Sequence, residues 1–422
     1  MHRTATFAGH VTSGLAPSPV SALGGIGRKS PDDVVIISAF RTPIGRAKKG
    51  AFKDTTPDDL LAAVLSATLK KTGVNPKEVG DVVVGNVQLG GAYAGPARMA
   101  QLRAGFPEDV PLHTVNRQCS SGLQAVAHVA AGIKAGMYDC GIGAGVESMT
   151  HGGGVNDAQS MPPVNVNELM ANPLARDCLV PMGMTAENVA ERYGVSREDQ
   201  DKMGVESHTK ALAAQAAGKF NDEIIPVEVT VQDAQGNEQK VTVDKDDGPR
   251  ATTMEGLGKL KTVFKPKGGT VTAGTSSQVS DGAAAVLLMS RAKADKLGLK
   301  PLGCIRSSKV VGVKPDEMGV GPAVAIPAAC EAAGVKVDDI DVFEVNEAFA
   351  AQALYCVRKL NIPDAKLNPL GGAIALGHPL GCTGARQVAT LLHEMKRTNK
   401  KLGVVSMCIG TGMGMASVFE AE

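Results

Sequence analysis

The sequence contains no tryptophan, and aromatic residues of all kinds make up only 3% of the chain. Charge of one sign is also missing, because 44 Lys and Arg residues nearly balance 43 Asp and Glu residues for a formal net charge of +1. General nucleic-acid binders need a basic surface with interleaved aromatic side chains. The composition therefore argues against nucleic acid as a partner.

Paired cysteines and long apolar runs are absent as well. The eight cysteines all lie at least 21 residues apart, so the chain has no CxxC pair. That spacing excludes zinc ribbons and predicts reduced thiols in an intracellular protein, with neither a disulfide framework nor a bound metal. No run reaches the roughly 18 apolar residues that a membrane-spanning helix needs. We therefore expect no membrane span.

Acidic residues are missing from residues 1–31, which are rich in Ala, Gly, Ser and Pro and carry Arg3, Arg28 and Lys29. This composition is typical of a targeting extension. The string RTATFAGHV at residues 3–11 resembles the N-terminal peroxisomal targeting nonapeptide, although Thr4 and Val11 depart from that pattern. The resemblance implies that the protein is located in the peroxisome and that residues 3–11 bind the import receptor. A mitochondrial presequence, leading to the matrix, is the alternative.

The remaining residues show strands that alternate with helices. Val34–Ile37 is a short apolar run, Pro57 opens a stretch with leucines at helical spacing, and residues 81–86 form a second apolar run. A helix over 122–134 and a strand within 138–149 follow. Such alternation predicts an α/β fold with a parallel or mixed sheet that is covered on both faces.

An internal repeat indicates duplicated halves. Residues 81–87, DVVVGNV, resemble residues 341–347, DVFEVNE, at an offset of 260. Each string precedes a Gly-rich loop, a helix and a strand that ends in Gly-rich sequence. We expect an N-terminal half over 32–149 that residues 275–292 complete, an insert over 150–274, and a C-terminal half over 293–422. Within the insert we expect helices near 185–193 and 197–215 and a hairpin over 227–243.

Four segments place a reactive side chain beside glycines or a helix start. Cys119 lies just before the predicted helix at 122, where the helix dipole and free N–H groups predict a lowered thiol pKa. Asn346 follows an apolar strand. His378 lies among five glycines with Pro379 after it, and Cys408 lies at a strand end in a Gly-rich turn. Each has a purely structural alternative when taken alone.

Together these segments resemble the thiolase family from about Val34 to the C-terminus. The matching strings are NRQCSSGLQAV, GVESM, PMGMTAENVAERYGVSREDQD, TAGTSSQVSDGAAA, NEAFA, GGAIALGHPLGCTGARQ and CIGTGMG. Within the family the chain is similar to the degradative 3-ketoacyl-CoA thiolases of the peroxisomal type. The resemblance implies the thiolase fold: duplicated βαβαβ-type halves in a five-layered αβαβα arrangement with an inserted loop domain. It also implies a homodimer.

The resemblance also implies roles for these residues. Cys119 would attack the 3-keto carbon and carry the acyl group, His378 would take the thiol proton, and Cys408 would protonate the leaving acetyl-CoA enolate. Asn346, through a water, and His378 would stabilise that enolate. Backbone N–H groups of Cys119 and Gly410 would form a second oxyanion hole.

Coenzyme A would be a cosubstrate, and no permanently bound cofactor is implied. Ser277 matches the family position that contacts the pantetheine arm, while Thr275 stands where the family usually has Asn. Arg250 is the candidate phosphate contact, with Lys259 and Lys261 as weaker ones. Glu347 is expected to orient its neighbours rather than to donate a proton.

Three alternatives remain open at this stage. An acetoacetyl-CoA thiolase working in the condensing direction is disfavoured because Pro181 stands where such enzymes carry His. A decarboxylating ketoacyl synthase would have His or Asn in place of Cys408. A non-catalytic relative that binds CoA or lipid is opposed by the presence of Cys119, His378 and Cys408.

Overall fold

The computed structural model describes residues 23–152, 163–232 and 236–422. The nonapeptide at 3–11 lies outside these residues. The described chain forms one mixed sheet of ten strands and a separate two-stranded hairpin. No helix within these residues is long and apolar enough to cross a membrane.

One half of the large sheet has the strand order β1-β8-β5-β3-β4, and the short strand β2 pairs with β8. Strands β3, β4 and β5 run parallel, whereas β8 is antiparallel to both β1 and β5. The bounds are β1 Val34–Arg41, β2 Gly45–Arg46, β3 Asp81–Gly85, β4 Leu112–Val115, β5 Cys140–Ser148 and β8 Ser280–Ser290.

The other half repeats this order as β9-β12-β11-β10 and joins the first half where β1 pairs with β9. A parallel bridge between Phe343 and Leu367 lies where the first half has the β3–β4 pair. The bounds are β9 Gly303–Gly312, β10 Val342–Val345, β11 Leu402–Ile409 and β12 Met413–Ala421. The predicted duplication is confirmed.

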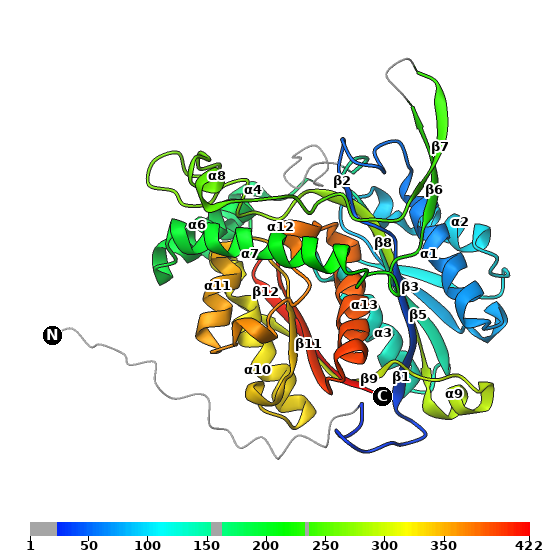
Figure 1. Ribbon diagram of the computed structural model, residues 1–422. Coiled ribbons are helices and arrows are strands. Elements are labelled where there is room, and N and C mark those ends of the chain that lie inside the picture. The colour runs from blue at the N-terminus through cyan, green and yellow to red at the C-terminus, as the bar shows by residue number, and fades with distance from the viewer. Residues whose placement is uncertain (1–22, 153–162, 233–235) are drawn as a thin grey trace.

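Helices cover both outer faces and fill the space between the halves (Figure 1). Helices α1 and α2 cover the first half, α10 packs on β9, β11 and β12, and α3 and α13 pack against each other in the middle. The five-layered αβαβα prediction is therefore confirmed. The bounds are α1 Pro57–Thr72, α2 Ala94–Arg103, α3 Ser121–Lys134, α9 Arg291–Leu297, α10 Gly321–Ala333, α11 Ala350–Lys359, α12 Ala373–Leu376 and α13 Leu380–Thr398.

Local sequence explains the ends of α1. Pro57 occupies the first turn, where its missing N–H costs nothing, and Asp58 and Asp59 face the positive end of the helix dipole. Lys70 and Lys71 lie in the last turn, and Gly73 ends the helix in the left-handed region with φ 68°. Sequence and dipole agree at both ends of this helix.

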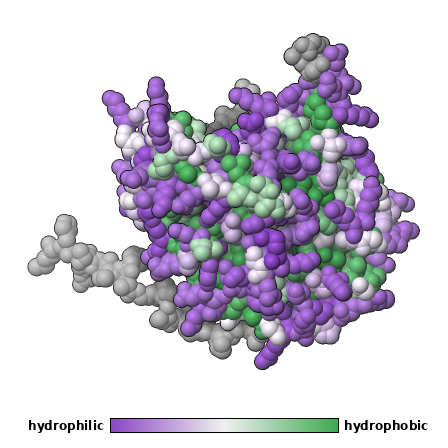
Figure 2. Space-filling view, in the orientation of Figure 1, coloured by the Kyte–Doolittle hydropathy of each residue, from purple (hydrophilic) through white to green (hydrophobic). Residues whose placement is uncertain are grey.

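The segment between β5 and β8 lies across the ends of the two halves in Figure 1. Helices α6 and α7 and the hairpin β6–β7 confirm the three elements expected there, and the hairpin projects from the body of the molecule. The bounds are α4 Val166–Ala171, α5 Pro173–Asp177, α6 Met182–Tyr193, α7 Arg197–Ala216, β6 Val227–Gln232, β7 Glu238–Val243 and α8 Met254–Gly258. Figure 2 shows a mainly hydrophilic surface with small scattered hydrophobic areas on this side.

Candidate active site

Glycine contacts bring the first turns of α3 and α13 together. A Cβ atom on Gly384 would lie 2.2 Å from the backbone nitrogen of Leu123, and one on Gly122 would lie 2.8 Å from the carbonyl oxygen of Gly381. Only glycine lets the two backbones approach so closely. Because Cys119 precedes α3 and His378 precedes α13, this contact places both residues at the centre of the molecule.

Cys119 lies at the end of a tight turn. The preceding residue, Gln118, has φ 47°, a left-handed conformation that costs a non-glycine residue about 1–3 kcal/mol. The Cys119 side chain is only 2% exposed. The backbone N–H groups of Gly410 and of Cys119 itself lie near its sulfur, where they favour the thiolate and work to lower the pKa.

The expected lowering of the Cys119 pKa is wrong for this state of the site. Burial raises the pKa of the Cys119 thiol to about 11 although the two nearby backbone N–H groups work to lower it, and the charge of Glu147 adds to the rise. Loss of hydration outweighs the helix dipole because the sulfur is fully enclosed. The resting residue is therefore a neutral thiol.

His378 is held by hydrogen bonds at both ring nitrogens. Nδ1 lies 2.6 Å from Thr383 Oγ1, and that hydroxyl donates its own hydrogen to the carbonyl oxygen of Pro379 at 2.9 Å. The hydroxyl must then accept from Nδ1–H, which leaves Nε2 without a proton. Asn346 Nδ2 donates to Nε2 at 3.3 Å. The network selects the tautomer that can accept a proton at Nε2.

Electrostatics keep this imidazole neutral. His378 is 4% exposed, and its burial, together with the nearby charge of Arg386, lowers its pKa to about 3. A neutral thiol and a neutral imidazole therefore coexist, rather than a preformed thiolate–imidazolium pair. Proton transfer has to accompany attack by the sulfur.

Cys408 is the penultimate residue of β11, which pairs with β10, the strand that leads to Asn346. The backbone N–H of Asn346 donates to the carbonyl oxygen of Ser406 at 2.9 Å, which joins the two strand ends. Cys408 is completely buried and packs with Met318 and Ala348. Burial is the main reason that the pKa of Cys408 lies well above its usual value, and the negative charge that a Cys119 thiolate would carry raises it further. A thiol of such high pKa holds its proton until a strong base, such as an enolate, is present.

One cavity of about 260 Å³ is lined by Cys119 and His378, whereas Cys408 and Asn346 are not among its lining residues. It is also lined by Ser277, whose backbone N–H donates to the carbonyl oxygen of Ala348 at 2.9 Å. The rest of its wall is mainly apolar. The other lining residues are Met149, Met182, Gly183, Phe264, Ser276, Gln278, Val279, Ala348, Phe349 and Leu380.

Arg250 does not line this cavity. Its side chain is exposed and borders a separate hollow of about 420 Å³ whose wall includes Ala273 and Gly274, just before Ser276. Lys259 is paired with Glu255 at 2.5 Å. No group of His, Cys, Asp or Glu suited to a metal ion occurs in the described part of the chain.

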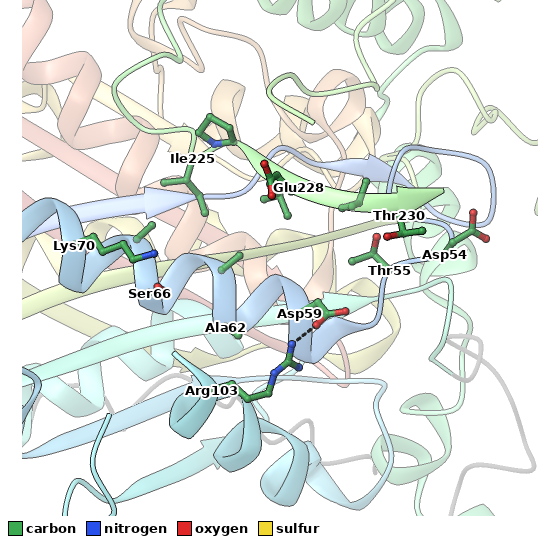
Figure 3. A pocket seen from close by; sticks show the side chains of 15 residues that line it. Asp54, Thr55, Asp59, Ala62, Ser66, Lys70, Arg103, Ile225, Glu228 and Thr230 are labelled. Atoms are coloured by element: carbon green, nitrogen blue, oxygen red, sulfur yellow. Dashed lines mark hydrogen bonds and ion pairs between the residues drawn. The ribbon is translucent and has the colours of Figure 1, made fainter. Parts of the chain in front are cut away.

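A hollow of about 550 Å³, larger than the cavity at Cys119, lies elsewhere, between α1 and β6 (Figure 3). Arg103 contacts Asp59 at its edge at 2.5 Å, and Lys70 lies along α1. Its lining residues include neither cysteine nor histidine. This hollow therefore lacks the nucleophile and the base that the smaller cavity contains.

Two groups around His378 were not anticipated. Thr383 fixes the ring tautomer, and the carbonyl oxygen of Gln278 accepts the backbone N–H of His378 at 3.0 Å. A hydroxyl five residues after a histidine at a helix start could have indicated Thr383. Nothing local in the sequence indicates Gln278, because the contact joins distant segments.

The expectation for Glu347 agrees with its contacts. Its buried carboxylate accepts hydrogen bonds from the hydroxyl of Ser207 at 2.7 Å, from Asn368 Nδ2 at 2.7 Å and from the backbone N–H of Ile374 at 3.2 Å. These bonds join α7, the loop before α12 and α12 itself. Glu347 therefore supports the segment that leads to His378.

Fold and site define a duplicated α/β protein that encloses a thiol and an imidazole in a single apolar cavity, with a second thiol behind them. Comparison with known proteins places it more narrowly. Residues 34–292 match the thiolase N-terminal domain, and residues 299–421 match the thiolase C-terminal domain. The chain belongs to the thiolase family.

Individual relatives agree with this assignment. The rat peroxisomal 3-ketoacyl-CoA thiolase B is 58% identical over 429 residues, which cover 100% of this chain and 99% of that protein. The crystal structure of the dimeric peroxisomal thiolase of Saccharomyces cerevisiae has a TM-score of 0.85 at 48% identity and covers 94% of this chain and 99% of that one. A second yeast structure, of peroxisomal 3-ketoacyl-CoA thiolase, is described as five-layered and built from two core domains of identical topology. It has a TM-score of 0.76 at 44% identity over 94% of this chain and 100% of that one.

Proposed function

We propose that the protein catalyses CoA-dependent cleavage of 3-ketoacyl-CoA to acetyl-CoA and a shortened acyl-CoA, with Cys119 as the acyl carrier. The observation that carries the proposal is that Cys119 and His378 line the same cavity, and that the unprotonated nitrogen of the His378 ring, Nε2, can accept a proton. The full-length relative from rat is named a 3-ketoacyl-CoA thiolase, which supports this substrate class.

In the first half-reaction, the Cys119 thiol gives its proton to His378 Nε2 while sulfur bonds to the 3-keto carbon. The tetrahedral oxyanion collapses, the bond between the α and β carbons breaks, and acyl-Cys119 remains. The Cys408 thiol protonates the departing acetyl-CoA enolate. In the second half-reaction, the Cys408 thiolate takes the proton of CoA, whose sulfur then attacks the acyl carbon. The bond between the acyl carbon and Cys119 Sγ breaks, the shortened acyl-CoA leaves, and His378 returns its proton to the Cys119 sulfur. No metal or redox group enters this scheme.

Two sets of donors stabilise the oxyanions. The N–H groups of Cys119 and Gly410 lie near the Cys119 sulfur, and this proximity supports their assignment as donors to the acyl oxygen. Asn346 Nδ2 beside His378 Nε2 would hold the enolate oxygen through a water. One such donor typically contributes about 10²–10³ in rate.

For coenzyme A, we assign the pantetheine arm to Ser277 at the cavity wall and a phosphate to Arg250 beside it. Ser277 lines the catalytic cavity, and the hollow at Arg250 begins a few residues away along the chain, at Ala273 and Gly274. The insert 150–274 would then bind the nucleotide end of CoA. The N-terminal half would consist of residues 32–149 and 275–292, and the C-terminal half of residues 293–422. CoA acts as a cosubstrate, and no cofactor stays bound.

The names of the relatives also support a cellular compartment and an oligomeric state for this protein. The relatives from rat and yeast are named peroxisomal, and one yeast structure is named dimeric. We therefore assign this chain to the peroxisome as a homodimer. Residues 3–11 would bind the import receptor.

A thiolysis assay tests the proposal. Purified wild-type protein should cleave 3-ketoacyl-CoA only when CoA is present, and mass spectrometry should show an acyl group on Cys119. Cys119→Ala should lose turnover, by about 10⁴-fold or more, together with the covalent adduct, because the nucleophile is gone. Cys178→Ala, which removes an exposed cysteine, is the matched control and should behave as wild type. Turnover that survives in Cys119→Ala would overturn the mechanism.

A further inference from the structure

The two halves place different residues at equivalent strand ends. In the first half Val82 pairs with Ile142, and in the second Val342 pairs with Gly403. Glu147 lies five residues after Ile142 on β5, and Cys408 lies five residues after Gly403 on β11. The two residues therefore occupy equivalent positions in the two halves. The antiparallel neighbours agree, since Glu147 pairs with Gly282 and Cys408 with Gly414.

The equivalence extends to two more positions. Asn86 follows β3 as Asn346 follows β10, and Cys119 precedes α3 as His378 precedes α13. Of the four side chains given a catalytic role, the second half thus supplies Asn346, His378 and Cys408, and the first half supplies Cys119. Asn86 and Glu147 are left without a catalytic assignment.

Glu147 is fully buried and accepts four hydrogen bonds. Oε1 accepts from Asn86 Nδ2 at 3.2 Å and from the backbone N–H of Gln88 at 3.2 Å. Oε2 accepts from the backbone N–H of Val87 at 3.1 Å and of Gly381 at 2.9 Å. All four partners are donors, so each carboxylate oxygen must act as an acceptor.

Gly381 is the contact that reaches the other half. It lies in the first turn of α13, three residues after His378, where a buried carboxylate meets the positive end of the helix dipole. A Cβ atom on Gly381 would lie 2.7 Å from the Cα atom of Asn86 and 2.8 Å from the carbonyl oxygen of Val146. The start of α13 is thus pressed against β3 and β5 and tied to both through Glu147.

We propose that Glu147 is a positioning residue that holds His378 in register with Cys119 across the boundary between the halves. It does not line the catalytic cavity, so it acts through Gly381 and the first turn of α13. This inference rests on the proposed thiolysis. Loss of the carboxylate lets the first turn of α13 shift, and an ångström of misplacement between base and nucleophile is enough to slow proton transfer strongly.

Glu147→Gln is the test variant. The amide keeps the shape of the side chain, but its NH₂ group would face N–H donors and could not accept their hydrogen bonds. We expect kcat and the single-turnover rate of Cys119 acylation to fall together by about 10–100-fold. KM for CoA and for 3-ketoacyl-CoA should stay within about threefold, because the cavity wall is intact. Iodoacetamide should still label Cys119.

Asp33→Asn is the matched control. Asp33 is also buried and accepts hydrogen bonds from Ser30, Arg291 and Arg306, but none of these partners belongs to α13, and Asp33 does not line the catalytic cavity. Its loss should lower the melting temperature while kcat stays near the wild-type value. Equal kcat losses in Glu147→Gln and Asp33→Asn would reduce Glu147 to a general stabilising role and overturn the proposal.

Glu147→Asp covers the case in which the amide variant does not fold. The shorter side chain keeps its charge but cannot contact Gly381 and the loop after β3 together, so kcat should again fall with KM preserved. Wild-type kcat in a folded variant at position 147 refutes the positioning role. Absence of thiolysis in the wild type would instead refute the proposed function, so the two failures are distinguishable.

Discussion

At the residue scale, enclosure dominates the chemistry of the site. Cys119, His378 and Cys408 are all buried, and in each case loss of hydration is the largest influence on the pKa. Desolvation favours the neutral form of every group. The resting site therefore holds two thiols and a neutral imidazole, and charges develop only when substrate supplies an oxyanion for the N–H donors.

This state predicts the pH dependence of alkylation. With its pKa raised to about 11, Cys119 is almost entirely protonated at pH 7, and its thiolate fraction should rise about tenfold for each pH unit between 7 and 9. The rate of iodoacetamide labelling at Cys119, read by peptide mass spectrometry in substrate-free protein, should follow that slope. A rate that levels off below pH 8 would instead mean a lowered pKa and would contradict the burial argument.

At the scale of elements, the contact between α3 and α13 decides where the site forms. Both helices begin with glycines that meet across the boundary between the halves. Side chains at these positions would separate the helix starts and therefore Cys119 from His378. Packing between two helices, rather than a loop, sets this part of the active-site geometry.

Gly384→Ala measures that packing. The new Cβ would lie 2.2 Å from backbone nitrogen of Leu123, so the free energy of unfolding should fall by about 1–3 kcal/mol, with loss of activity. Gly95→Ala in α2 meets nothing within 4 Å and should be neutral or stabilising by up to about 1 kcal/mol. Chemical denaturation of both variants checks this. Equal stabilities would contradict the proposed close approach.

At the scale of the whole molecule, a buried ion cluster joins segments that are far apart in the sequence. Arg41, at the end of β1, contacts Glu223 at 2.6 Å and Asp246 at 2.6 Å, and all three side chains are completely buried. Glu223 also accepts the hydroxyl hydrogen of Thr390, on α13, at 3.0 Å. The cluster thus ties the segment between β5 and β8 to the first strand and to the central helix.

Removal of Arg41 should therefore destabilise the entire chain. Arg41→Ala leaves two buried carboxylates without their cation, which typically costs about 3–5 kcal/mol. Lys202→Ala removes an exposed cation that lies 3.9 Å from Glu206 and should change stability by less than about 0.5 kcal/mol. Thermal unfolding of both variants distinguishes these outcomes, and a small effect of Arg41→Ala would mean that the cluster does not join the segments.

Local sequence patterns were sufficient to predict much of the fold. Apolar runs and helix-end signals located β1, α1, α3 and the helices α6 and α7, because burial periodicity and capping are local properties. The repeat at an offset of 260 indicated the duplication. Prediction failed for the Cys119 pKa, since the helix dipole can be inferred from sequence whereas the depth of burial cannot.

By itself, the sequence determined which reactive groups this protein has and the order of its elements, since residue identity and hydrophobic periodicity are written along the chain. Only the tertiary structure decided the tautomer of His378, the protonation of Cys119 and the four donors around Glu147. Those properties depend on hydration and on contacts between residues as distant as Glu147 and Gly381, and both arise only when the two halves pack together.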